Sequence, residues 1–137
     1  MLLTHKQIQD ITQQMEEFNS PDDNEYILFL KNLWDSLPEP KHQQPEQISN
    51  WIIDCIFETY FQMGCYIEAK EWALKGLNND TAQYDSYEYI QAGRVCYELK
   101  EYDEAMKYFS IAYERGKKRA FQEFDKKYWE FYSKNKK

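Results

Sequence analysis

The residues of this chain that could do chemistry are two histidines, three cysteines and many carboxylates. His5 falls in the first turn of an expected helix, and His42 falls in a proline-rich stretch. Neither has a His, Cys or Asp partner at the spacing of a metal site. We therefore interpret both as surface histidines, with no metal bound.

The cysteines, Cys55, Cys65 and Cys96, occur singly, which argues against a zinc site and favours a reducing cytoplasm. Cys55 and Cys96 fall at helical positions suited to packing, where cysteine behaves as a small apolar residue. Cys65 falls at a turn, without a base or a glycine-rich loop to activate it. The sequence has no P-loop, GxGxxG or GxSxG motif, and its carboxylates are too numerous for any pair to be informative. We predict that the protein is not an enzyme and needs no cofactor.

The composition is that of an acidic chain with many aromatic rings. Its 137 residues include 17 Lys+Arg and 24 Asp+Glu, a net charge of −7, and 18% are aromatic. This length suggests one domain with a real core. No apolar run approaches the roughly 18 residues of a membrane span, and the polar start of the chain argues against a secretory signal. With four Gly and four Pro, we expect a mostly helical, cytoplasmic protein.

The charge is unevenly divided along the chain. Residues 1–114 hold 8 basic and 21 acidic residues, whereas residues 115–137 hold 9 basic and 3 acidic ones. The basic end could be a patch for nucleic acid or a membrane. Its rings recur at helical spacing, however, so we interpret it as an amphipathic helix whose Lys and Arg complement the negative helix end. We predict neither a nucleic-acid nor a membrane partner, because an acidic chain binds phosphates poorly.

The first two expected helices begin at recognisable signals. Thr4 followed by Gln7 is typical of a capping box and predicts a helix from about residue 5 to 19. Ser20 as N-cap and Pro21 at the first helical position predict a second helix. Three prolines between residues 37 and 45 then predict a loop.

The remainder of the chain reads as helix, short turn, helix, several times over. Gly64 and Gly116 are placed as C-terminal caps of two of these helices. The pattern Tyr-x-Glu-Ala occurs twice, and its alanines, Ala69 and Ala105, lie 36 residues apart. This spacing is close to the roughly 34-residue period of the tetratricopeptide repeat.

The second copy of this pattern resembles a tetratricopeptide repeat well. Small residues at Gly93, Ala105 and Ala112 would allow two helices close approach, with larger residues filling the space around that contact. The first copy departs from the pattern, because Phe57 stands where a small residue is usual. This departure suggests looser or shifted packing in the first helix pair. The resemblance covers roughly residues 48–117.

This resemblance implies an all-α fold: a tetratricopeptide-like right-handed solenoid of about seven helices in antiparallel pairs with a C-terminal capping helix. We expect one helical-repeat domain over residues 1–137. Its last helix is expected to be a cap, because the end repeats of a solenoid need one. Its parts are a divergent helical pair over 1–40, repeats over 45–79 and 82–116, and the capping helix over 117–134.

In such a solenoid, the first helix of each pair lines the concave face. The residues predicted to bind a partner there are Asp54, Glu58, Phe61, Tyr87, Gln91, Arg94, Tyr97 and Glu98. Tyrosines give large contact area and carboxylates favour a basic protein partner. The alternative for each residue is that it only seals helix packing or forms a solvated face.

Tetratricopeptide domains that hold the acidic C-termini of heat-shock chaperones use Lys and Asn at corresponding positions. This chain has Asp54, Glu58, Ile90 and Arg94 there. Because Asp54 and Glu58 would repel a carboxylate, we do not expect a co-chaperone of that kind.

A narrower resemblance extends over most of the chain. It is carried by Trp34, residues 37–41, Ala69 with Trp72, and the segment 119–131. With these features the chain is similar to small bacterial tetratricopeptide proteins encoded beside polymorphic toxins, which act as immunity proteins. The resemblance implies a cytoplasmic protein that binds a cognate toxin domain stoichiometrically. Many such toxins are nucleases and therefore basic, which would suit an acidic binder.

Two other functions stay open at this point. A secretion chaperone or adaptor would hold an extended peptide in the concave groove with micromolar affinity. A nucleic-acid-binding regulator would act through residues 115–137 and bind in a salt-dependent manner. The sequence leaves the oligomeric state open.

Overall fold

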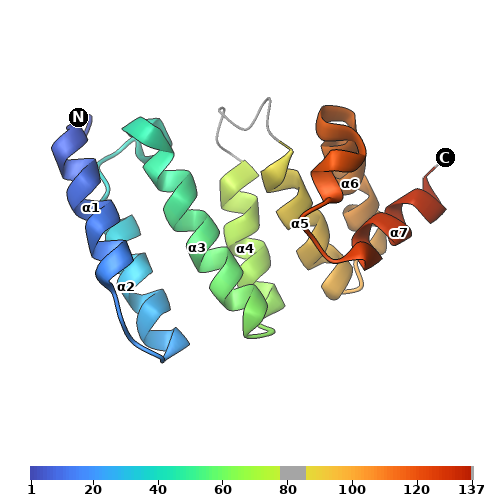
Figure 1. Cartoon of the computed structure of the whole chain (residues 1–137), viewed down its shortest axis with the longest axis horizontal. Coiled ribbons are helices and arrows are strands. Elements are labelled where there is room, and N and C mark those ends of the chain that lie inside the picture. Colours follow the sequence, from blue (N-terminus) through green and yellow to red (C-terminus); the bar gives the residue numbers. More distant parts are fainter. Residues whose placement is uncertain (78–85, 137) are drawn as a thin grey trace. The chain divides into compact units, whose positions relative to one another are not determined.

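The computed structural model describes residues 1–77 and 86–136, and all regular secondary structure in these residues is helical. Seven α-helices lie in this part of the chain (Figure 1): α1 (His5–Glu17), α2 (Asp23–Ser36), α3 (Ile48–Gln62), α4 (Tyr66–Leu77), α5 (Tyr87–Glu98), α6 (Tyr102–Gly116) and α7 (Lys126–Asn135). Three 3₁₀ helices accompany them: η1 (Lys41–Gln43), η2 (Pro45–Gln47) and η4 (Lys117–Phe121). The prediction of an all-α protein is confirmed for the described residues. None of their helices combines the length and the apolar character needed to cross a membrane.

The chain divides into two compact units, Met1–Gly64 and Cys65–Lys137. The boundary falls inside residues 45–79, the first expected repeat. The boundary between the two expected repeats, with the end of the first at residue 79 and the start of the second at residue 82, lies outside the described residues.

The start of α1 confirms the predicted capping box. The Thr4 hydroxyl accepts a hydrogen bond from the Gln7 N–H at 3.1 Å, and the Gln7 side chain accepts one from the Thr4 N–H at 2.8 Å. The predicted start of α2 is wrong, because its N-cap is Asp22, which accepts a hydrogen bond from the Asn24 N–H at 2.9 Å. Pro21 therefore lies outside the helix, and the Ser20 hydroxyl contacts Glu25 instead.

In the first unit, the proline-rich loop is held by polar side chains. Gln44 is 4% exposed, accepts a hydrogen bond from the Leu3 N–H at 2.9 Å and donates to the carbonyls of Met1 and Pro38. The Lys41 ammonium donates to two carbonyls at the C-terminal end of α2, at 2.8 and 2.9 Å. A cation is favourable there because the carbonyls at a helix end lack partners.

The core of the first unit is aliphatic and lies largely between α2 and α3. Its most buried side chains are Leu30, Ile48, Ile52, Ile56 and Phe57. Phe57, where the expected repeat would have a small residue, is only 1% exposed. The ring is therefore accommodated within this core.

In the second unit, α5 and α6 pack closely through a glycine. A Cβ placed on Gly93 would lie 2.4 Å from Cε1 of Phe109. Ala105 and Ala112 on α6 are 0% exposed. The prediction that small residues allow these two helices close approach is confirmed.

The two predicted glycine caps have different outcomes. Gly64 follows α3 with φ +78°, and its N–H donates to the Phe61 carbonyl at 3.0 Å, so it ends the helix as predicted. The prediction for Gly116 is wrong, because it ends α6 with φ −126° and the residue with positive φ is Lys117, at φ 56° and ψ −154°. Gly116 instead allows close approach: a Cβ there would lie 3.0 Å from Ala120 Cβ and from the Ser86 hydroxyl.

The C-terminal segment, expected as one helix over 117–134, consists of η4 and α7 joined by residues 122–125. Asp125 caps α7, where its carboxylate accepts a hydrogen bond from the Lys127 N–H at 3.0 Å. Both pieces bury rings: Phe121, Tyr128 and Tyr132 are 3%, 2% and 5% exposed. Because the segment is interrupted at residues 122–125, η4 and α7 each place buried rings in the second unit.

Candidate functional site

Three of the eight predicted partner-binding residues, Asp54, Glu58 and Phe61, lie on α3 in the first unit. All three are half-buried. Asp54 and Glu58 are four residues apart, so their carboxylates share one helix face, and both raise the pKa of the Cys55 thiol, after burial as the main cause. The Phe61 ring packs against Phe57 with a centroid distance of 5.6 Å. This face therefore combines negative charge with an aromatic ring.

The other five lie on α5 in the second unit, and the structure joins three of them in a chain of hydrogen bonds. The Gln91 side-chain amide donates to the Tyr87 hydroxyl at 2.9 Å, and the Arg94 guanidinium donates to the side-chain oxygen Oε1 of Gln91. Gln91 is only 3% exposed. The Arg94 guanidinium also lies over the Phe124 ring, 4.8 Å from its centroid. These side chains are thus linked to each other and to the segment before α7.

The last two, Tyr97 and Glu98, contact α7. The Tyr97 ring meets Tyr128 and Phe131 edge-on at 5.4 and 5.1 Å. The Glu98 side chain is 14% exposed, accepts a hydrogen bond from the Tyr128 hydroxyl at 3.1 Å and pairs with the Lys127 ammonium. The hydrogen bond that the Lys127 ammonium donates to Glu98 raises the pKa of Lys127. The C-terminal part of the α5 face therefore already holds a basic helix of the same chain.

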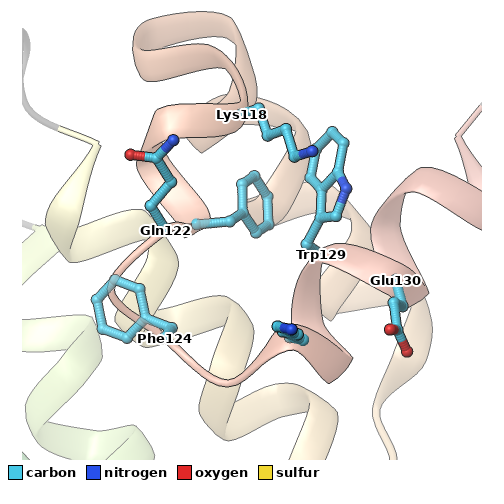
Figure 2. A pocket seen from close by; sticks show the side chains of 7 residues that line it. Lys118, Gln122, Phe124, Trp129 and Glu130 are labelled. Carbon is cyan, nitrogen blue, oxygen red and sulfur yellow. The ribbon is translucent and has the colours of Figure 1, made fainter.

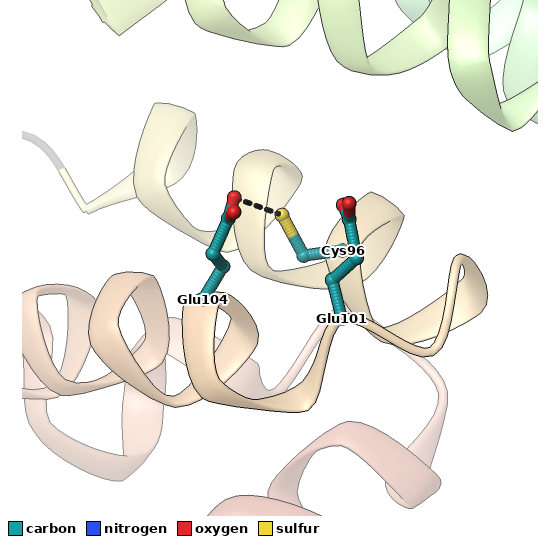
Figure 3. Close-up of side chains that lie close together, drawn as sticks. All are labelled: Cys96, Glu101 and Glu104. Atoms are coloured by element: carbon teal, nitrogen blue, oxygen red, sulfur yellow. Dashed lines mark hydrogen bonds between the residues drawn. The ribbon is translucent and has the colours of Figure 1, made fainter.

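A second group of chemical interest joins α4, α5 and the start of α6 (Figure 3). Ligand atoms of Cys96, Glu101 and Glu104 all lie within 4.8 Å of one another, and the thiol lies 3.8 Å from Glu104. The Lys70 ammonium pairs with Glu101 at 2.8 Å and with Glu104 at 3.0 Å. The lysine lowers the pKa of Glu104, and hydrogen bonding to Glu101 raises the pKa of Lys70.

Cys96, Glu101 and Glu104 carry atoms of the kinds that bind metal ions, but two observations argue against a metal ion here. Burial raises the pKa of the Cys96 thiol to about 12, so the thiolate that a metal prefers is disfavoured. A cation would also have to replace the Lys70 ammonium between the two carboxylates. We interpret the group as an ion-pair cluster that ties α4 to α6.

We expect Cys96 to resist alkylation in the folded protein. Its side chain is 0% exposed, and its raised pKa leaves roughly one thiol in ten thousand ionised at about pH 8. Iodoacetamide treatment followed by peptide mapping should modify the half-buried Cys65 first, and all three cysteines in urea. Equal modification rates of Cys96 and Cys65 in the native protein would contradict this interpretation.

The segment from η4 to α7 also lines a pocket of about 260 Å³ (Figure 2). Its lining residues are Lys118, Phe121, Gln122, Phe124, Lys126, Trp129 and Glu130. The Lys118 ammonium lies over the Trp129 ring, 5.4 Å from its centroid. No sequence motif predicts this pocket, because the pocket depends on the break between η4 and α7.

Comparisons of the chain with family models, with curated proteins and with solved structures found no match. The features of the chain that bear on function are an acidic, aromatic face on α3 and an α5 face in contact with α7.

Proposed function

We propose that this is a non-catalytic binding protein of the cytoplasm that holds a basic protein partner, as an immunity protein holds a cognate bacterial toxin domain. The observation that carries the proposal is the charge of the first unit. Residues 1–64 contain eleven Asp and Glu but only three Lys and no Arg. Its carboxylates far outnumber the cations available within the unit, so a basic surface would be attracted to it.

The partner-binding surface in this proposal begins on α3. Asp54 and Glu58 place two carboxylates one turn apart, and Phe61 adds an aromatic ring one turn further along. Half-buried carboxylates and rings are suited to interfaces, because little side-chain freedom is lost when a partner covers them. Inhibition would be stoichiometric, by covering the active site of the toxin or locking its shape.

We further propose that the helices from Ile48 onward form tetratricopeptide-like antiparallel pairs in a right-handed solenoid. The close approach of Gly93 to Phe109 supports this proposal, as do the buried alanines Ala69 and Ala105. These are small residues at the positions where a helical repeat brings two helices together.

Reversing two charges on α3 is expected to weaken partner binding by about 100-fold, because like charges brought together cost several kcal/mol. The variant is Asp54→Lys with Glu58→Lys, and the partner to co-express is the product of the adjacent gene. Affinity is measured by calorimetry and protection by growth of the co-expressing cells. Asp10→Lys with Glu16→Lys, at exposed positions of α1, is the control with the same change in net charge.

The same experiment separates the proposed function from its alternatives. If no complex forms and no toxicity is relieved, the immunity proposal is wrong. Micromolar binding to a linear segment of the partner, in place of tight binding to its folded domain, would instead indicate a secretion chaperone or adaptor.

A further inference from the structure

The C-terminal end of the second unit has a surface of opposite character to α3. Its basic side chains gather around rings: Lys117 and Lys136 lie over Tyr113, and Lys118 lies over Trp129. Between residues 117 and 136 of the described chain, Lys127 alone among the lysines and arginines forms an ion pair. The positive charge of this surface is therefore left for an external anion.

Two adjacent depressions lie on this surface. The first is the pocket of about 260 Å³ in Figure 2, with an apolar part formed by Phe121, Phe124 and Trp129 and with Lys118 and Lys126 in its lining. The second, of about 370 Å³, is lined by Ser86, Tyr87, Arg119, Ala120, Gln122, Glu123 and Phe124. Gln122 and Phe124 belong to both, so the depressions are neighbours.

The sizes of the depressions suit side chains better than a small molecule. Small-molecule sites typically occupy about 300–1,000 Å³, and these two depressions, of about 260 and 370 Å³, lie just below and just above the lower end of that range. Two neighbouring depressions fit an extended chain that places one side chain in each. Gln122, between them, carries an amide able to donate to and accept from a peptide backbone.

From this geometry we propose that the surface around Gln122 binds an acidic peptide segment of a partner protein, with an apolar or aromatic side chain in each depression. Lys118, Arg119 and Lys126 attract its carboxylates. The ligand is opposite in charge to the partner proposed for α3, so this is a second binding site that goes beyond the proposed function. Because it uses other residues, either proposal can fail without the other.

The test uses the full chain and three fluorescein-labelled peptides, Asp-Glu-X-Ser-X-Glu-Asp with X as Leu, Phe or Trp. Fluorescence anisotropy at low salt should give a Kd on the order of 10–100 μM for at least one peptide. Affinity should fall with added salt. A peptide with Lys in place of every acid, and one with Ser in place of X, should not bind.

Three variants assign the binding to this surface. Lys118→Glu with Lys126→Glu should weaken it by at least about tenfold, and Gln122→Trp should do the same by filling both depressions. Glu130→Gln should strengthen binding about twofold, since it removes the acid from the first pocket. Lys6→Glu with Lys107→Glu, at exposed positions outside residues 117–136, makes the same charge change elsewhere and should alter affinity by less than about twofold.

Four results would overturn the proposal. The first is no binding of any of the three peptides below about 1 mM. The second is an equal loss of peptide affinity in Lys118→Glu with Lys126→Glu and in the control variant. The third is tighter binding of a single-stranded oligothymidylate than of every peptide, also lost in Lys118→Glu with Lys126→Glu. The fourth is self-association of the chain, measured by sedimentation and abolished by that same variant, without peptide binding.

Discussion

Replacing Gly93 with alanine is expected to lower the free energy of unfolding by about 2 kcal/mol, although alanine is the better helix former. The added methyl carbon would lie 2.4 Å from Cε1 and 2.5 Å from Cδ1 of Phe109. Phe109 is 0% exposed and has the rings of Phe121 and Tyr128 around it at 5.4 and 6.0 Å. It has little room to move, and overpacking a dense core costs about 1–3 kcal/mol.

Urea unfolding followed by circular dichroism measures this cost. Gly64→Ala is the matched control, since a Cβ there meets nothing within 4 Å and only the positive φ of +78° is penalised, by about 1 kcal/mol. Phe109→Leu should suppress most of the cost of Gly93→Ala and none of the cost of Gly64→Ala. If the two alanine variants respond equally to Phe109→Leu, the close packing of Gly93 on Phe109 is not the cause.

The features that were predictable from the sequence depend on residues close together in the chain. The capping box of Thr4 and Gln7 and the left-handed Gly64 each depend on a few consecutive residues. The close packing of α5 on α6 at Gly93 was predictable for another reason. Gly93, Ala105 and Ala112 stand at the small positions of the tetratricopeptide pattern, so the approach of two helices could be inferred from local spacing.

Features for which two neighbouring residues could fill the same role were not predictable. Both Ser20 and Asp22 are good N-caps, and the structure uses Asp22. At the end of α6, Gly116 makes the close contact with Ala120, and the positive φ falls on Lys117 instead. Residue type alone does not decide such cases, because the packing of distant residues does.

The candidate site shows the same limit at larger scale. A helical spacing of rings over residues 117–134 predicted a cap but not which face of α5 it would meet. The contacts of α7 with Tyr97 and Glu98 depend on the break at residues 122–125, for which the ring spacing gives no signal. The cluster around Lys70 likewise joins residues 31 positions apart. Half of the α5 face thus had a partner within the chain that no local pattern indicated.

That contact leads to the second large effect, at Tyr128. Tyr128→Ala is expected to lower the free energy of unfolding by about 4 kcal/mol, because the ring is 2% exposed and leaves a cavity among other rings. Tyr128→Phe keeps the ring and removes only the hydroxyl that donates to Glu98, which should cost about 1 kcal/mol. Lys126→Ala, at an exposed position of the same helix, should change stability by less than about 0.5 kcal/mol.

The hydroxyl contribution should disappear at alkaline pH, which distinguishes it from a packing effect. Burial raises the pKa of Tyr128 in the folded protein, and the Glu98 carboxylate raises it further although Arg94 opposes the shift. In the unfolded chain the pKa is about 10. A group whose pKa is higher in the folded state contributes its full stabilisation below the unfolded pKa and loses it as the pH rises toward the folded pKa.

The stability gap between the wild type and Tyr128→Phe should therefore be constant from about pH 7 to 9 and shrink above about pH 10. Burial also raises the pKa of Tyr26, to about 12, and that of Tyr108. Both proteins will consequently lose stability at high pH, and only the difference between them reports on Tyr128. A gap that stays constant to about pH 11 would show that folding does not raise the pKa of Tyr128, which would contradict a buried hydroxyl bonded to Glu98.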